Sequence, residues 1–134
     1  MGTIVVGYVA KPEGRAALHR AVDEARLRNA RLLVVSSNKG GLLQDTDAVK
    51  EADIELDKVS QELRDEGIAF EVRGLVRGNE PADDLIAVAE ETNADFIVIG
   101  LRRRTPVGKL ILGSNAQRIL LDATCPVLAV KADE

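Results

Sequence analysis

The chain has 134 residues, of which 46% are hydrophobic and 30% charged, a balance typical of one globular domain and not of a disordered tail. We therefore expect a single domain over residues 1–134. A net charge of −4 disfavours nucleic acid as a partner, and a single tyrosine and two phenylalanines leave few side chains to stack on bases. No apolar run approaches the ~20 residues that span a bilayer, and residues 4–6 are too few for a secretion signal, so we expect no membrane contact and a cytoplasmic location.

The first half of the chain alternates strand and helix patterns. Residues 3–9 form an apolar, β-branched run typical of a buried strand, and residues 31–36 form a second one. The apolar face of the helix between them consists of Ala17, Leu18, Ala21, Val22 and Ala25. A loop at residues 38–41 leads to a long helix, whose apolar stripe consists of Ala48, Ala52, Leu56, Val59 and Leu63. Gly67 stands where a C-terminal helix cap is expected.

The second half continues the alternation. Ile68, Phe70 and Val72 alternate with polar or small residues, as in a strand with one face more exposed. Residues 78–81 open a third helix, whose inward positions are Ala82, Leu85, Ile86 and Ala89. Apolar runs at 96–99 and 127–130 predict two final strands, with a helix at 113–122 between them. Five strands interleaved with four helices predict an α/β fold with a mostly parallel sheet covered on both faces.

The segment from residue 100 to residue 114 carries the strongest functional signal. It joins the fourth predicted strand to the last helix and reads Gly-Leu-Arg-Arg-Arg-Thr-Pro-Val-Gly-Lys-Leu-Ile-Leu-Gly-Ser. With Ser114 as the predicted N-cap, backbone N–H groups, a hydroxyl and cations converge there, which is a pattern typical of anion binding. Residues 100–118 contain no acid, whereas residues 45–66 contain nine. The alternative interpretation of the arginines is a solvated run of charge.

Ligands of open parallel sheets bind beyond the carboxyl ends of strands, where the strand order reverses. Two such ends carry irregular or glycine-rich loops, residues 7–14 after the first strand and residues 100–113 after the fourth. These loops face each other across one crevice if the two strands are neighbours.

The glycine loop resembles the phosphate loop of the universal stress protein family, in which glycine, two residues, glycine, nine residues and Gly-Ser or Gly-Thr follow one another. Gly100, Gly113 and Ser114 stand at the matching positions, and Arg103 replaces the second glycine. The resemblance covers essentially the whole chain, including residues 12–18, 77–85 and 125–131. It implies the strand order 3-2-1-4-5 and a Rossmann-like fold of the adenine nucleotide alpha hydrolase type.

The resemblance also implies a stress-response protein that binds an adenine nucleotide, such as ATP or AMP, or a related phosphate ligand, between the first and fourth strands. Magnesium is expected only together with the nucleotide. The residues expected at the phosphates are Gly100, Leu101, Arg102, Arg103, Gly113, Ser114, Asn115 and Lys11. Those expected near the base are Tyr8 and Val35, with Val9 at the start of the adjoining loop. Tyr8 has the alternative of being a partly buried core residue.

Two positions depart from the family pattern. Val9 replaces an aspartate that contacts nucleotide and metal in the family's nucleotide-binding members, and its side chain accepts no hydrogen bond. Arg103 either pairs with phosphate oxygens, with Lys11 adding charge from the opposite loop, or fills the crevice. The second hypothesis is accordingly a dimeric interaction or regulatory module with an occluded crevice.

An enzyme, of the slow ATP-hydrolysing kind, is the third hypothesis, because the sequence presents no nucleophile–base pair and we predict no catalytic residue. One cysteine and one histidine, His19, are too few for a zinc site, and His19 is expected at the surface. We predict no protein-held metal. The neighbouring acids Asp83 and Asp84 diverge around a helix and are both expected to face solvent.

Dimerisation is predicted from the last strand. On the order 3-2-1-4-5 this strand lies at a sheet edge, and an uncovered apolar edge favours pairing with a second copy of the chain. The residues expected at the interface of the homodimer are Val127, Leu128, Ala129 and Val130.

Overall fold

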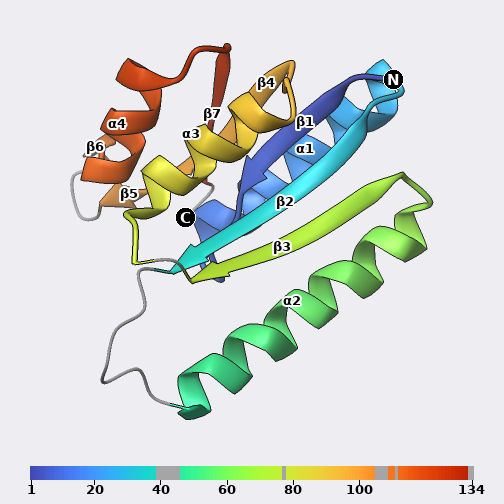
Figure 1. The fold of residues 1–134 in the computed structure, drawn as a ribbon, viewed down its shortest axis with the longest axis horizontal. Coiled ribbons are helices and arrows are strands. Elements are labelled where there is room, and N and C mark those ends of the chain that lie inside the picture. Colours follow the sequence, from blue (N-terminus) through green and yellow to red (C-terminus); the bar gives the residue numbers. More distant parts are fainter. Residues whose placement is uncertain (39–45, 77, 105–108, 111, 133–134) are drawn as a thin grey trace.

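The protein is described by a computed structural model that covers residues 1–38, 46–76, 78–104, 109–110 and 112–132. Its centre is a five-stranded sheet in which each neighbouring pair of strands is parallel (Figure 1). In spatial order the strands are β3 (Phe70–Val76), β2 (Arg31–Asn38), β1 (Thr3–Gly7), β4 (Phe96–Leu101) and β7 (Val127–Lys131). Counted along the sequence within this sheet, the order is 3-2-1-4-5, so the predicted fold and strand order are confirmed.

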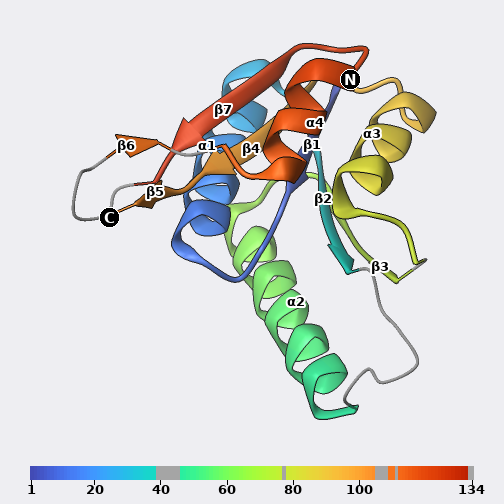
Figure 2. The ribbon, with the colours of Figure 1, turned by 90° about the vertical axis from the view of Figure 1, so that its left-hand side faces the viewer.

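Helices cover both faces of the sheet (Figures 1 and 2). They are α1 (Pro12–Arg28), α2 (Thr46–Glu66), α3 (Pro81–Glu91) and α4 (Ser114–Asp122). Pro12 and Pro81 lie in the first turns of α1 and α3, where the missing N–H of proline costs no helical hydrogen bond. Asn29 at φ 52° ends α1, and Gly67 at φ 73° follows α2, as the predicted cap requires.

The core consists of one apolar layer on each face of the sheet. Ile4 and Val6 of β1 belong to the layer under α1 and α2, whereas Val5 belongs to the layer under α3 and α4. This division follows from the alternation of side chains along a strand. Central strands buried on both faces explain the continuous apolar runs in the sequence. Among the described residues, no helix is both long enough and apolar enough to cross a membrane.

The stripe predicted for α2 is wrong in its first half. Val59 and Leu63 are buried, but Ala52 is exposed, and the side chain of Ala48 lies outside the described residues. A helix of 21 residues is about 31 Å long, whereas the seven residues of its partner strand β3 extend about 23 Å. The N-terminal half of α2 therefore extends beyond the sheet that would bury it.

The segment between β4 and α4 differs from a plain loop. It contains an antiparallel pair formed by β5 (Arg103–Arg104) and β6 (Lys109–Leu110). The N-cap of α4 is Gly113, with an extended backbone at φ −69° and ψ 167°, and Ser114 is the first helical residue. The prediction of Ser114 as the N-cap was wrong by one position. No side-chain hydrogen bond caps this helix, so its first turn presents backbone N–H groups.

Candidate functional site

Two adjoining cavities lie beyond the carboxyl ends of β1 and β4, which are neighbours in the sheet as the resemblance implied. We call the cavity of about 180 Å³ the inner cavity and that of about 320 Å³ the outer cavity. The residues that line both are Val9, Glu13, Gly100, Asn115 and Ala116. The loops after β1 and β4 thus contribute to the same cleft.

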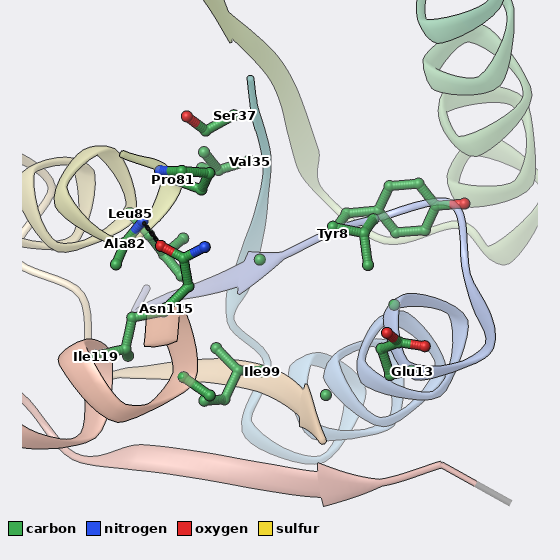
Figure 3. Close-up of a pocket in the computed structure, with 15 residues that line it drawn as sticks. Tyr8, Glu13, Val35, Ser37, Pro81, Ala82, Leu85, Ile99, Asn115 and Ile119 are labelled. Atoms are coloured by element: carbon green, nitrogen blue, oxygen red, sulfur yellow. Dashed lines mark hydrogen bonds between the residues drawn. The ribbon is translucent and has the colours of Figure 1, made fainter. Parts of the chain in front are cut away.

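The inner cavity is mostly apolar (Figure 3). Its hydrophobic walls come from four elements and include Val35, Leu85, Ile99 and Ile119. Asn115 brings a polar group to this cavity from α4. Its Oδ1 accepts a hydrogen bond from the Ala82 backbone N–H at 3.2 Å, which satisfies an N–H donor in the first turn of α3. The other half of the amide, the nitrogen, points into the cavity in Figure 3.

The outer cavity is more polar. Besides the shared residues, its lining consists of Leu101, Arg102, Gly113 and Ser114. The first turn of α4 contains no acid, so the positive end of the helix dipole faces this cavity without a neutralising charge from that turn. Arg102 Nε lies 3.4 Å from Glu13 Oε2, and this ion pair joins the loop after β4 to α1. The outer cavity therefore presents backbone donors, a hydroxyl and a guanidinium.

Glycines allow backbone to approach backbone at the base of the cleft. A Cβ atom on Gly14 would lie 1.8 Å from the Val9 carbonyl oxygen, and one on Gly100 would lie 1.9 Å from the Glu13 carbonyl oxygen. A Cβ atom on Gly113 would meet no protein atom within 4 Å. Packing thus accounts for Gly14 and Gly100, whereas nothing in the described structure requires glycine at position 113.

The remaining predicted site residues fall into three groups. Val35 is buried in the wall of the inner cavity, and Leu101 is buried beside the outer one. Val9 is 46% exposed between the two cavities. Lys11 is exposed at the start of α1 and lines neither cavity. The side chain of Arg103 lies outside the described residues.

Tyr8 is both a core residue and part of the inner cavity wall. It is only 3% exposed, and its hydroxyl donates a hydrogen bond to Glu55 Oε1 on α2 at 2.5 Å. Burial, and then this hydrogen bond, raise the pKa of Tyr8. In Figure 3 the ring extends toward α2 and away from Asn115. The phenol therefore ties the loop after β1 to α2, and the base of the side chain borders the cavity.

The acid pair on α3 corrects a prediction. Asp83 is exposed and pairs with Arg118 at 3.2 Å, but Asp84 is only 1% exposed. Adjacent helical residues diverge by about 100°, so one of two neighbouring acids can face the sheet while the other faces water. Asp84 lies one turn before the fully buried Val88, and this spacing was the signal in the sequence that places it inward.

The described residues contain no group of three or more His, Cys, Asp or Glu side chains that could hold a metal ion. Among the residues that line the two cavities, Glu13 is the one acid, and it pairs with Arg102. Val9 offers no ligand atom in its side chain.

Known proteins resemble this chain over its length. The universal stress protein family matches residues 1–131. A universal stress protein of Mycolicibacterium smegmatis is 42% identical over 128 residues, which cover 96% of each chain. The structure of a universal stress protein from Archaeoglobus fulgidus is 40% identical with a TM-score of 0.86, covering 98% of this chain and 99% of that one. The structure of a universal stress protein from Archaeoglobus fulgidus in complex with dAMP is 35% identical with a TM-score of 0.80, covering 98% of each chain.

Proposed function

Because this chain belongs to the universal stress protein family, we propose that it binds an adenine nucleotide in the cleft formed by the inner and outer cavities. The base occupies the inner cavity and the phosphates occupy the outer one. The observation that carries the proposal is the division of the cleft into an apolar part and a part with anion-binding groups.

The inner cavity has the properties of a base site. A purine ring is flat and largely apolar on its faces, and the side chains of Val35, Ile99 and Ile119 offer it hydrophobic contact. Asn115 adds hydrogen-bonding capacity where the two cavities meet. Together the two cavities fall within the range of roughly 300–1,000 Å³ that is usual for small-molecule sites.

The outer cavity has the properties of a phosphate site. The N–H groups of the first turn of α4 lack helical acceptors, and a phosphate at this end is favoured by the helix dipole. The Ser114 hydroxyl and the Arg102 guanidinium add a neutral and a charged donor. The universal stress protein solved with dAMP supports the same class of ligand, since its structure covers this chain almost completely. Magnesium would be held through the phosphates.

Titration calorimetry with ATP, ADP and AMP tests this proposal. Loss of a hydrogen bond to a charged group costs about 1.5–3 kcal/mol, so Ser114→Ala should weaken binding by about 10- to 150-fold. It should hardly change stability, because no side-chain hydrogen bond caps α4. Gln117→Ala is the matched control, since Gln117 is exposed on the same helix and lines neither cavity. Wild-type protein that gives no heat with any of the three nucleotides would contradict the proposal.

The alternative, an interaction module with an occluded crevice, is favoured by one observation. Arg102 already has a partner in Glu13, and this ion pair lies at the outer cavity. This alternative would be favoured if calorimetry shows no nucleotide binding and if mass spectra of material released from the denatured, purified protein show no nucleotide.

We also propose that the protein forms a homodimer through β7, whichever ligand it binds. β7 pairs with β4 along one side and ends the sheet order among the described residues. Its residues Val127, Leu128, Ala129 and Val130 are each partly exposed. Antiparallel pairing with β7 of a second copy would satisfy this edge and is self-complementary about a two-fold axis.

A further inference from the structure

Asp84 is the one charged residue that the described part of the chain buries, with 1% of its surface exposed. It lies in the first turn of α3, where a negative charge is favoured by the helix dipole. Burial of a charge is costly unless hydrogen bonds compensate it, so the partners of Asp84 indicate what the buried carboxylate does.

Both carboxylate oxygens accept hydrogen bonds from side chains. The Ser37 hydroxyl donates to Oδ2 at 2.5 Å, and Asn79 Nδ2 donates to Oδ1 at 3.2 Å. An ionised carboxylate can only accept, so the hydroxyl hydrogen of Ser37 is committed to Asp84. The Ser37 oxygen can therefore act toward a ligand only as a hydrogen-bond acceptor.

Ser37 lies at the end of β2 and lines the inner cavity, next to the apolar wall formed by Val35 and Leu85. Figure 3 shows it beyond Val35, at the α3 side of the cavity. Within the apolar part of the cleft, a ligand atom that reaches Ser37 thus meets a hydrogen-bond acceptor of fixed polarity.

We propose that the Ser37–Asp84 pair selects a base that carries an amino group over one that carries a carbonyl group at the same position, that is, adenine over hypoxanthine or guanine. This inference rests on the proposed nucleotide binding and names the residues that set its base specificity. The amino group at C6 of adenine donates a hydrogen bond to the Ser37 oxygen. A carbonyl at C6 would place two acceptors against each other, because Asp84 prevents the hydroxyl from turning its hydrogen toward the base.

The comparison of AMP with IMP tests this effect, because the two nucleotides share their sugar and phosphate and differ only at C6 and N1 of the base, and Ser37→Ala assigns the difference to the serine contact. A site whose buried polar group is left without its partner rejects the wrong ligand strongly, and we expect wild-type protein to bind AMP at least about 10-fold more tightly than IMP. Ser37→Ala should reduce that preference to less than about threefold, mainly by weakening the binding of AMP.

Asp84→Ala gives the complementary result. It leaves the Ser37 hydroxyl in place but frees its hydrogen to turn toward the base, so affinity for IMP should rise toward that for AMP. Asp83→Ala is the matched control, because Asp83 is the exposed neighbour on the same helix and should retain the wild-type preference. Thermal unfolding tests whether each variant is folded. If Asp84→Ala does not fold, the AMP and IMP affinities of Ser37→Ala decide whether the Ser37–Asp84 pair selects the base.

The titrations distinguish a failure of nucleotide binding from a failure of base selection. Wild-type protein that binds neither nucleotide overturns the proposed function and this inference with it. Wild-type protein that binds AMP and IMP equally, or a Ser37→Ala variant that keeps the full preference for AMP, overturns the role of the Ser37–Asp84 pair and leaves adenine nucleotide binding in place.

Discussion

Replacement of Gly100 by alanine tests how closely α1 and β4 approach at the base of the cleft. The added methyl carbon would lie 1.9 Å from the carbonyl oxygen of Glu13 and 2.5 Å from its carbonyl carbon. Non-bonded carbon atoms are normally about 3.5–4.0 Å apart, so α1 and β4 would have to separate by more than about 1 Å. Because the atoms of Glu13 that collide belong to the backbone, a change of rotamer cannot relieve the contact.

The expected cost follows from the effects of overpacking. Extra atoms in a packed interior destabilise by about 1–3 kcal/mol, occasionally more. An unfolding entropy of about 2.1 cal/mol/K per residue gives about 0.28 kcal/mol/K for a chain of 134 residues. Gly100→Ala should therefore lower Tm by about 4–11 °C, even though alanine reduces the entropy of the unfolded chain.

Differential scanning calorimetry of Gly100→Ala and Gly113→Ala makes the comparison. Gly113 is the control because its added Cβ would meet no protein atom within 4 Å and its φ of −69° suits alanine. We expect the control to shift Tm by less than about 2 °C. Equal Tm values for wild type and Gly100→Ala would refute the close approach of β4 to α1.

Two further predictions concern Tyr8 and β7. Tyr8 is the chain's single tyrosine and tryptophan is absent, so tyrosinate absorbance reports this residue alone and should give a pKa above 10.0. Because the pKa of Tyr8 is raised in the folded state, the stabilisation from Tyr8 is complete below pH 10 and is lost as the pH rises through the folded-state pKa. Tyr8→Phe should remove this loss of stability at high pH. A measured pKa at or below 10.0 would contradict the described burial of Tyr8. Leu128→Pro removes a ladder donor from β7 and should turn a sedimenting dimer into a monomer, whereas a wild type that is monomeric at micromolar concentration would rule out the proposed interface.

The sequence predicted the positions of the main elements because their signals are local. Apolar runs mark β1, β2, β4 and β7, and Gly67 ends α2 in the left-handed conformation that glycine favours. Strand order is not local, and here it came from the family resemblance. The antiparallel pair of β5 and β6 carried no signal in the sequence, because each of its strands has only two residues.

The site was less predictable, because its geometry depends on contacts between distant segments. Gly100 and Gly113 are both glycines of the loop pattern, yet a Cβ atom on Gly100 would collide with the backbone of α1 and one on Gly113 would meet no protein atom within 4 Å. Asp84 looked like a surface acid because Ser37, its partner from β2, is 47 residues away in the sequence and is brought to it by the fold, whereas Asn79 is only five residues away. The only local indication that Asp84 is buried was its place on the same helix face as Val88.

In the proposed nucleotide site, the ion pair between Glu13 and Arg102 would place a carboxylate beside the incoming phosphate. A phosphate that contacts Arg102 would either displace this carboxylate or share the guanidinium with it, and in both cases it gains less than the full attraction of Arg102. The free energy lost in this way is small, because Arg102 is 59% exposed and such an ion pair contributes only about 0–1 kcal/mol. The attraction of a doubly charged phosphate to Arg102 would exceed this loss, whereas an uncharged nucleoside would leave the ion pair intact. The cleft would thus favour a charged ligand whatever its base, and adenosine should bind more weakly than AMP in parallel titrations.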